Sequence, residues 1–403
     1  MLDEMRPGFK LAIALAAVVA VWLVVVFLLG VRFVIVRPVE GILPYTFNGW
    51  AEHPAARHLF LAQYQGEDFA VGRVYDSHPY PILFFFYLFL APFHFILGLP
   101  YEVAHNFLSY LYVVCLSGIL IVTSKRQLTA VLEAGNPFRW LLALMAIGIV
   151  VTCPQPWIST LAYDRDNLFI LTAGAFCYLS AGAFNDGVPR KALLGVGLFV
   201  AVWLPIFTPA WILAGVFFNR ALIVERRWLL SVLGVSALAA LNLIVPKVIA
   251  VWFALKPIGS GFRYRSGLDG STQYMTTVYQ AIVAPVGPRH WPVASYFVIA
   301  LVFAVVFHYQ FRKHQKQYYP LRQACFLLIP YSMIAILFPQ LTSIHPYSTD
   351  PLIVVPACFL IAFWSLREEF WRRLTGPTYV AWLVVASLIL MTNLLTVAQN
   401  LRP

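Results

Sequence analysis

Long apolar blocks alternate with short polar stretches along the whole chain. The blocks run for about 16–25 residues, and an α-helix needs about 20 apolar residues to cross the hydrocarbon layer of a bilayer. Backbone N–H and C=O groups have no water to bind in that layer, so each block is expected to be a helix. The alternation typical of an outer-membrane barrel is absent from the sequence. The pattern predicts spans at about 11–35, 103–123, 139–156, 166–184, 192–208, 209–219, 228–252, 292–310, 324–340, 351–366 and 378–398.

Two parts of this pattern allow another interpretation. The segments 192–208 and 209–219 are short and meet at Pro205 and Pro209, so they could form a re-entrant pair. The apolar block 80–98 is interrupted by prolines, and a span there would invert every loop that follows. We therefore expect 80–98 to be an interfacial helix on the outer face, within a first outer loop at 37–102.

Composition supports a membrane protein. The chain has 403 residues, of which 61% are hydrophobic and 11% charged, against roughly 45–50% and about 25% in soluble domains. The first apolar block is too long for a signal peptide and is followed by no small-residue cleavage site, so we expect it to be a retained span. The predicted fold is an all-α polytopic membrane protein with about 11 transmembrane helices, forming a single domain over 1–403.

The net charge of +11 is explained by topology rather than by nucleic-acid binding, because the basic residues lie in short loops between apolar blocks. With the spans above, one face collects 17 of the 28 basic residues, and this face should be cytoplasmic, as should the N-terminus. The expected location is the plasma (inner) membrane. The 17 residues are Arg6, Lys10, Lys125, Arg126, Arg139, Arg190, Lys191, Arg220, Arg226, Arg227, Arg312, Lys313, Lys316, Arg322, Arg367, Arg372 and Arg373.

The opposite, outer face holds ten of the 17 carboxylates and four stretches with candidate chemistry. Ionisable groups beside apolar spans are candidates for functional sites, although a single one is more often a solvated loop charge. The four stretches are the first loop with Glu52, Asp68, Tyr75, Asp76 and Tyr80; the start of the fourth span with Asp164, Arg165, Asp166 and Asn167; the loop 253–291 with Lys256, Arg263, Arg265 and Gln273; and the start of the tenth span with His345 and Tyr347.

These residue types together suit sugar transfer from a lipid-linked phosphate. A carboxylate can deprotonate an acceptor hydroxyl, cations can hold a phosphate leaving group, and a histidine can orient the acid. Simpler explanations exist for each part: Asp164 and Asp166 can pair with Arg165 or cap the fourth span, and Arg263 and Arg265 can meet lipid phosphates.

Metal and nucleotide sites are not indicated. His94, His105 and His308 are expected to be packing or interface residues, and the five cysteines are scattered singly. No His, Cys and carboxylate set has metal-ligand spacing, and no glycine-rich phosphate loop occurs in the sequence. No metal and no cofactor are therefore expected.

The order of the outer motifs resembles the GT-C glycosyltransferases, most closely glycosyltransferase family 87, which includes polyprenyl-phosphate-mannose-dependent mannosyltransferases and related arabinofuranosyltransferases. The resemblance covers most of the chain in patches, and no one motif is specific. The motifs that carry it are Glu52, Ala55-Ala56-Arg57, Gly66 or Gly72, Tyr75-Asp76, Tyr80-Pro81 and Ala91-Pro92; Asp164-Arg165-Asp166-Asn167 and Thr208-Pro209; Gly270-Ser271-Thr272-Gln273; and Ser343, His345, Tyr347 and Pro356.

The resemblance implies an inverting transferase that uses a polyprenyl-phosphate sugar donor and a lipid- or glycan-linked acceptor at the extracytoplasmic face. The family's catalytic acid is an Asp soon after the first span; here Glu52 takes that place by its spacing from Gly66, and Asp68 and Asp76 stay open as alternatives. The chain also lacks the family's Lys before Pro209 and its Gly-Gln before Asn167.

Two other classes remain open. A transporter or flippase of lipid-linked sugars would favour broken helices near the midplane, for which the Pro205/Pro209 break is the best support. An O-antigen ligase or polymerase would need a large late outer loop, whereas the longest outer loop expected here comes early.

Overall fold

The computed structural model describes the parts of the chain that build the helical bundle. The described residues are 73–75, 92–99, 118–119, 122, 125, 127–131, 133, 137–155, 174–175, 190–218, 224–252, 256–258, 273–284, 291–310, 320–344, 351–367, 370, 372 and 376–400.

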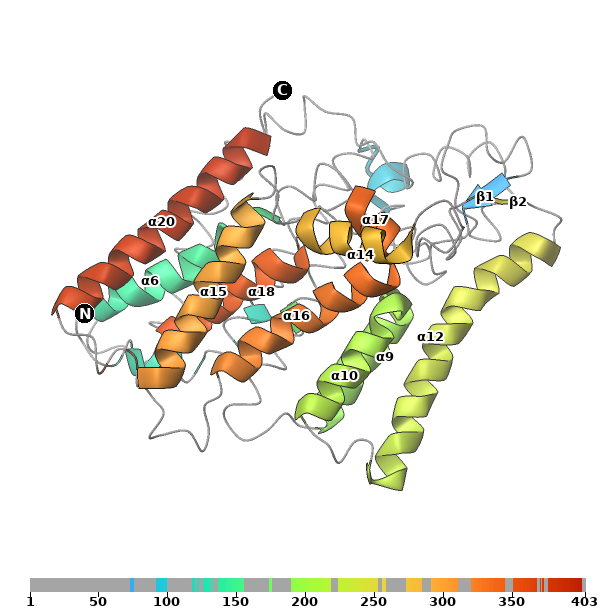
Figure 1. The fold of residues 1–403 in the computed structure, drawn as a ribbon, viewed down its shortest axis with the longest axis horizontal. Helices are drawn as coiled ribbons and strands as arrows, with labels where there is room; N and C mark the ends of the chain where they lie inside the picture. The colour runs from blue at the N-terminus through green and yellow to red at the C-terminus, as the bar shows by residue number, and fades with distance from the viewer. Residues whose placement is uncertain are drawn as a thin grey trace.

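The described part of the chain is almost entirely helical, as the apolar pattern predicts (Figure 1). Four of its helices are long and apolar enough to cross a membrane: Arg226–Ile249, Val293–Gln310, Pro320–Leu337 and Gly376–Thr396. Shorter apolar helices lie at Arg139–Val151, Pro205–Val216 and Leu352–Ser365. A membrane-embedded, helical protein is therefore supported; the total of about 11 spans and the GT-C fold stay predictions. The principal helices are α6 (Pro137–Val151), α9 (Arg190–Trp203), α10 (Thr208–Phe218), α12 (Arg226–Trp252), α15 (Trp291–Gln310), α16 (Pro320–Leu337), α18 (Pro351–Ser365) and α20 (Gly376–Asn400).

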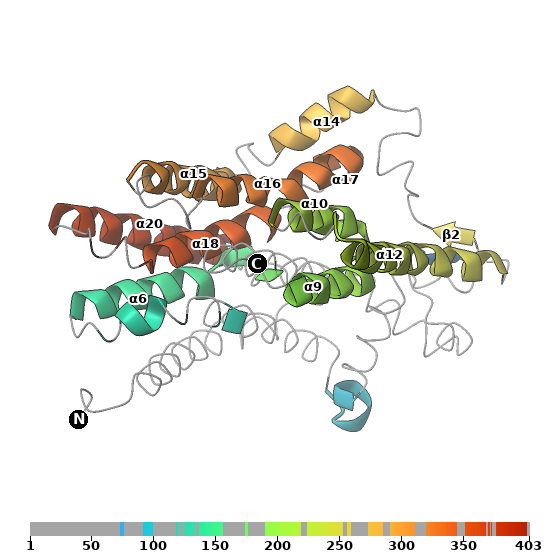
Figure 2. The ribbon, with the colours of Figure 1, turned by 90° about the horizontal axis from the view of Figure 1, so that it is seen from below.

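Helix α18 is the centre of the bundle. It packs against α6, α15 and α16. Every residue from Leu352 to Leu366 is buried, and the residues of this range other than proline are at most 5% exposed. A helix that is apolar all round suits burial on every side. Figure 2 shows α6, α18, α20 and α15 grouped together, with α9, α10 and α12 forming a second group beside them. Helix α16 contacts α10 as well as α15 and α18, so it joins the two groups.

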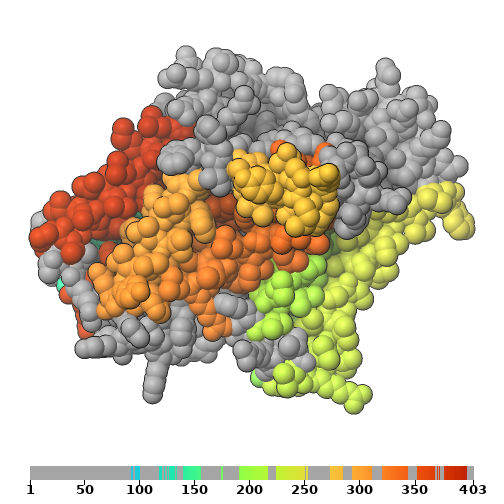
Figure 3. Space-filling model, in the orientation of Figure 1, coloured from blue at the N-terminus to red at the C-terminus, as the bar shows by residue number. Residues whose placement is uncertain are grey.

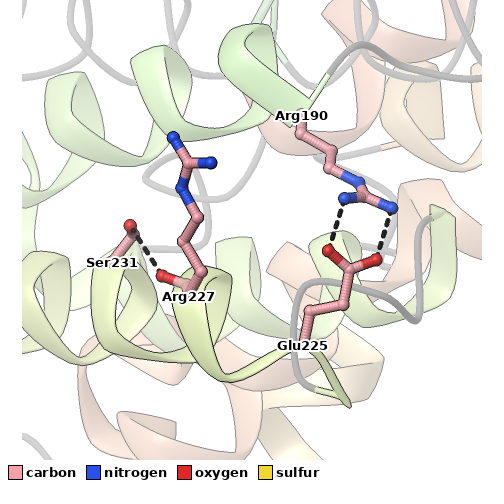
Figure 4. A network of polar contacts seen from close by, with 4 residues as sticks. All are labelled: Arg190, Glu225, Arg227 and Ser231. Carbon is pink, nitrogen blue, oxygen red and sulfur yellow. Dashed lines mark hydrogen bonds and ion pairs between the residues drawn. The ribbon is translucent and has the colours of Figure 1, made fainter.

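One end of the bundle, which we call the basic end, collects polar contacts between helix termini. Arg190 at the start of α9 donates two hydrogen bonds of 2.7 Å to the Glu225 carboxylate, just before α12 (Figure 4). Its guanidinium also lies 5.6 Å from the centre of the Trp228 ring. The Arg227 guanidinium lies on the same ring, and Ser231 donates to the Arg227 carbonyl. These contacts bring the starts of α9 and α12 together.

The basic end also joins the end of α18 to the start of α16. The Trp364 indole N–H donates a 2.7 Å hydrogen bond to the Gln323 side-chain oxygen. Phe307, near the end of α15, lies against Trp364 and Phe370, and Phe303 meets Trp382 near the start of α20. The starts of α9 and α12 therefore meet in one set of contacts, and the ends of α15 and α18 meet the starts of α16 and α20 in another. Which end faces the cytoplasm stays a prediction.

The opposite end, the α14 end, carries the shorter elements. They are strands β1 (Arg73–Tyr75) and β2 (Lys256–Ile258), helix α14 (Tyr274–Val283) and helix α17 (Pro339–Ile344) (Figure 1). The two three-residue strands are a small departure from the all-α prediction.

Helices α9 and α10 form a tight antiparallel hairpin around the 3-10 turn η2 (Pro205–Phe207). The described parts of α9 and α10 comprise 14 and 11 residues, and the residues before α9 and after α10 lie outside the described part of the chain. The Trp211 indole N–H donates to the Leu193 carbonyl at 2.8 Å, and Asn242 of α12 donates to the Ala201 carbonyl at 2.9 Å. Whether the hairpin is re-entrant or forms two complete spans stays a prediction.

The described end of the expected interfacial helix is a short π-helical turn, η1 (Pro92–Ile96). The turn ends at Ile96, and Gly98 follows it with a φ of 63°, in the left-handed region that glycine adopts without strain. Phe93 packs against the core, while Ile96 and Leu97 are exposed. The remainder of the segment 80–98 lies outside the described residues.

Candidate functional site

Two of the loops that carry candidate residues, both expected on the outer side, are joined by backbone pairing. Strand β1 runs parallel to β2 with Arg73 opposite Lys256 and Tyr75 opposite Ile258. Strand β2 follows the end of α12 and contacts it. With a rise of about 3.3 Å per residue and strands about 4.8 Å apart, the backbones of Tyr75 and Lys256 lie within roughly 8 Å of each other. The first loop and the loop after α12 therefore share one end of the bundle.

A further candidate, Gln273, directly precedes helix α14. Its backbone carbonyl accepts hydrogen bonds from the N–H and the hydroxyl of Thr277, at 3.0 and 3.2 Å. Its side chain is exposed and receives a 3.4 Å contact from the Thr276 hydroxyl. Gln273 is thus held through its backbone, which leaves its amide group accessible at the α14 end.

Tyrosine hydroxyls fix α14 to the end of α16. The Tyr274 hydroxyl donates to the Ile336 carbonyl, one of the terminal carbonyls that have no partner within a helix. The Tyr331 hydroxyl, in α16, lies 3.1 Å from the Ala281 carbonyl and 3.2 Å from that of Ile282. Helix α16 ends at Leu337, so its last carbonyls need partners outside the helix.

Helix α14 also packs along α17, whose last residue is Ile344. Thr342 of α17 is fully buried, and its hydroxyl donates to the Phe338 carbonyl at 3.2 Å. The residue after α17 is the predicted His345, which lies outside the described residues. The structure therefore brings the chain that leads into His345 beside the helix that follows Gln273.

A buried polar cluster ties together three helices near the same end. The Asn393 side-chain N–H groups donate to the Ile149 carbonyl at 3.1 Å and to the Thr152 hydroxyl at 3.0 Å, so Asn393 caps the last turn of α6. The Tyr296 hydroxyl donates to the Asn393 side-chain oxygen. Asn393 is 0% exposed. The cluster fixes the end of α6, from which the chain continues toward the predicted Asp164 to Asn167 motif.

Most of the predicted site residues lie outside the described part of the chain, so the structure neither joins nor separates them. These are Glu52, Asp68, Asp76, Tyr80, Asp164, Arg165, Asn167, Arg263, Arg265, His345 and Tyr347. Only Tyr75, Lys256 and Gln273 are described. Among the described residues, no group of His, Cys, Asp and Glu is arranged to hold a metal ion.

Three residues that support this end were not candidates from sequence: Tyr274, Tyr331 and Asn393. Asn393 carried a usable signal, because an amide in the middle of an apolar span must find a partner inside the protein. The two tyrosines carried none, because tyrosine is common at membrane interfaces.

Comparison of the chain with protein-family models, with curated proteins and with solved structures gives no significant match.

Proposed function

We propose that the protein is an integral membrane glycosyltransferase that moves a monosaccharide from a polyprenyl-phosphate donor to a lipid- or glycan-linked acceptor at the extracytoplasmic face. The observation that carries the proposal is the parallel pairing of β1 with β2, which sets Arg73 opposite Lys256 and joins the strand that contains Tyr75 to the strand that contains Lys256. The packing of α14 on α17 supports it, because it brings the chain near Gln273 to the chain that enters His345.

In the proposed reaction the acceptor hydroxyl oxygen attacks the anomeric carbon of the sugar, and the bond from that carbon to the phosphate oxygen breaks. A carboxylate takes the hydroxyl proton; Glu52 is the first candidate, with Asp68 and Asp76 as alternatives. The polyprenyl phosphate leaves as an anion, stabilised by Lys256, Arg263 or Arg265. His345 supports the acid or the phosphate, and Tyr75, Tyr80, Asp164, Arg165, Asn167, Gln273 and Tyr347 contact the sugar or the headgroup.

The base is tested by separate Glu52→Ala and Asp68→Ala variants, with transfer of labelled sugar from polyprenyl phosphate measured in membranes. We expect the variant that lacks the base to lose at least about a hundredfold in rate, the lower range for general-base catalysis. Glu133→Ala is the matched control, because Glu133 is exposed and precedes α6, whose start is expected at the cytoplasmic face. If both outer variants are abundant and fully active, the base assignment is wrong.

The phosphate contact is tested by Lys256→Ala and Lys256→Arg. Loss of a cation that holds the donor phosphate should raise KM for the donor, and arginine should restore part of it because the charge is retained. Equal KM values for all three proteins would remove Lys256 from the proposed site.

The second candidate function is a transporter or flippase of lipid-linked sugars. The hairpin of α9 and α10 supports it, because broken helices at membrane depth are typical of transporter binding sites. Purified protein in vesicles, given a fluorescent lipid-linked sugar and an acceptor, distinguishes the two. Translocation without glycosylated product would refute the transferase proposal.

A further inference from the structure

Helix α14 presents an apolar surface outward. Its inner face is formed by Thr277 and Ala281, at 2% and 0% exposed. At 100° per residue, the side chains opposite that face are Met275, Tyr279, Ile282 and Val283, which are 74%, 66%, 48% and 43% exposed. We call these four residues the α14 stripe. In Figure 3 the outer side of α14 lies open on the molecular surface, over α16.

The composition of α14 does not suit a surface in water. Residues 273–284 contain no Asp, Glu, Lys or Arg. A water-facing helix of a soluble protein normally carries charges opposite its buried face. The exposed polar residues, Thr276 and Gln280, lie together along one edge of the stripe. The helix therefore has a protein face, an apolar face and a polar edge.

The α14 stripe is next to surface that belongs in the acyl chains. Ile336, whose carbonyl accepts the Tyr274 hydroxyl, is itself 48% exposed at the end of a membrane-spanning helix. Helix α15, which follows α14 in the chain, exposes Val298 and Val302 at 55% and 53%. Helix α14 is thus attached to a helix whose exposed surface is apolar, and the next helix along the chain also has exposed apolar residues.

From this arrangement we infer that α14 is an interfacial anchor whose stripe lies in the acyl-chain layer of the membrane leaflet at the α14 end. The polar edge with Thr276 and Gln280 then faces the headgroups and water. Apolar burial at such an interface stabilises a helix lying in the membrane plane. The hydroxyl contacts of Tyr274 and Tyr331 attach α14 to α16. A membrane that holds α14 therefore also holds this end of the bundle in place.

The test places a photoactivatable benzophenone amino acid at Tyr279, on the stripe, or at Gln280, on the polar edge. Both side chains are exposed, so neither change disturbs the core. Each protein is reconstituted in vesicles of phosphatidylcholine and phosphatidylglycerol, irradiated and analysed by intact mass. We expect phospholipid adducts several-fold more often at position 279 than at position 280.

Two results would overturn the inference. Equal lipid labelling at the two positions, or none at position 279, would show that the stripe does not face acyl chains. A covalent dimer from position 279 would show instead that a second copy of the chain covers it. Because neither variant touches the proposed catalytic residues, these outcomes are independent of the proposed glycosyltransferase activity.

A second measurement does not depend on the probe. Met275→Glu places a charge in the stripe, whereas Gln280→Glu places the same charge on the polar edge. In lipid nanodiscs Met275→Glu should increase amide hydrogen exchange across α14 several-fold, and Gln280→Glu should leave it unchanged. Equal protection of α14 in the two variants would contradict the inference.

Discussion

The contact between Gly197 of α9 and Trp211 of α10 makes a sharp prediction about the hairpin. A Cβ atom at Gly197 would lie 2.2 Å from the nearest ring carbon of Trp211, far inside van der Waals contact. Trp211 has little room to move, because it is 1% exposed and its indole N–H is bound to the Leu193 carbonyl. Gly197→Ala must therefore push the two helices apart.

Gly195 is the matched control, because it lies on the same helix and a Cβ there meets nothing within 4 Å. Both substitutions gain the same helix propensity, about 1 kcal/mol, so this contribution cancels in their difference. Overpacking costs about 1–3 kcal/mol, and loss of the indole hydrogen bond adds about 1 kcal/mol. We expect Gly197→Ala to have a free energy of unfolding about 2–4 kcal/mol below that of Gly195→Ala.

The assay is unfolding in mixed micelles with increasing dodecyl sulfate, followed by a thiol-reactive dye. Cys153 and Cys358 are buried and become reactive when the bundle opens, whereas the exposed Cys325 reacts at the start and sets the baseline. A difference below about 0.5 kcal/mol between the two variants, the usual range for a neutral surface change, would refute the packing described here. The clash predicts in addition that Trp211→Leu lessens the cost of Gly197→Ala, since a double-mutant cycle detects residues in contact.

The remaining predictions concern the two ends of the bundle. Asn393→Leu should lower the free energy of unfolding by about 2 kcal/mol, because it removes three hydrogen bonds and such bonds inside a membrane average about 0.6 kcal/mol each. Leu394→Ala, at a neighbouring residue that is 50% exposed, is the control. An equal loss of stability in the two variants would contradict the capping role of Asn393. Arg190→Gln should lower the free energy of unfolding by at most about 1 kcal/mol, because the side chains of Arg190 and Glu225 are 35% and 47% exposed. This loss of stability should be smaller in high salt, which screens the ion pair. A loss that does not depend on salt would mean that the contribution of Arg190 comes from its contact with the Trp228 ring and not from the ion pair.

Much of the helical framework could be predicted from the apolar pattern. The predicted spans 228–252, 292–310 and 378–398 correspond to Arg226–Trp252, Trp291–Gln310 and Gly376–Asn400. The predicted and observed ranges agree because a long apolar segment in a bilayer is stable as a helix, which satisfies its backbone hydrogen bonds internally.

The differences at helix ends are caused by proline. The span expected at 324–340 includes Pro320, the first described residue of this helix, and it ends at Leu337 because Pro339 follows. Likewise the segment 192–208 stops at Trp203, before Pro205. A search for long apolar stretches in the sequence does not detect these effects of proline.

The short elements of the candidate site could not be predicted in the same way. Three-residue strands such as β1 and β2 carry no periodic signal, and their pairing depends on two loops far apart in the sequence. Helix α14 has only ten residues, and its amphipathic face is visible only once its partner α17 is known. The roles expected for Glu52 and His345 stay predictions.

The pairing of Arg73 with Lys256 has a consequence for biogenesis. A ribosome releases the segment of β1 long before it reaches β2, with the helices α6 to α12 made in between. Strand β1 therefore has no β2 with which to pair until more than half of the chain has been synthesised. Pairing of the two strands is therefore a late event, and a nascent chain stopped before Lys256 has no strand with which β1 can pair.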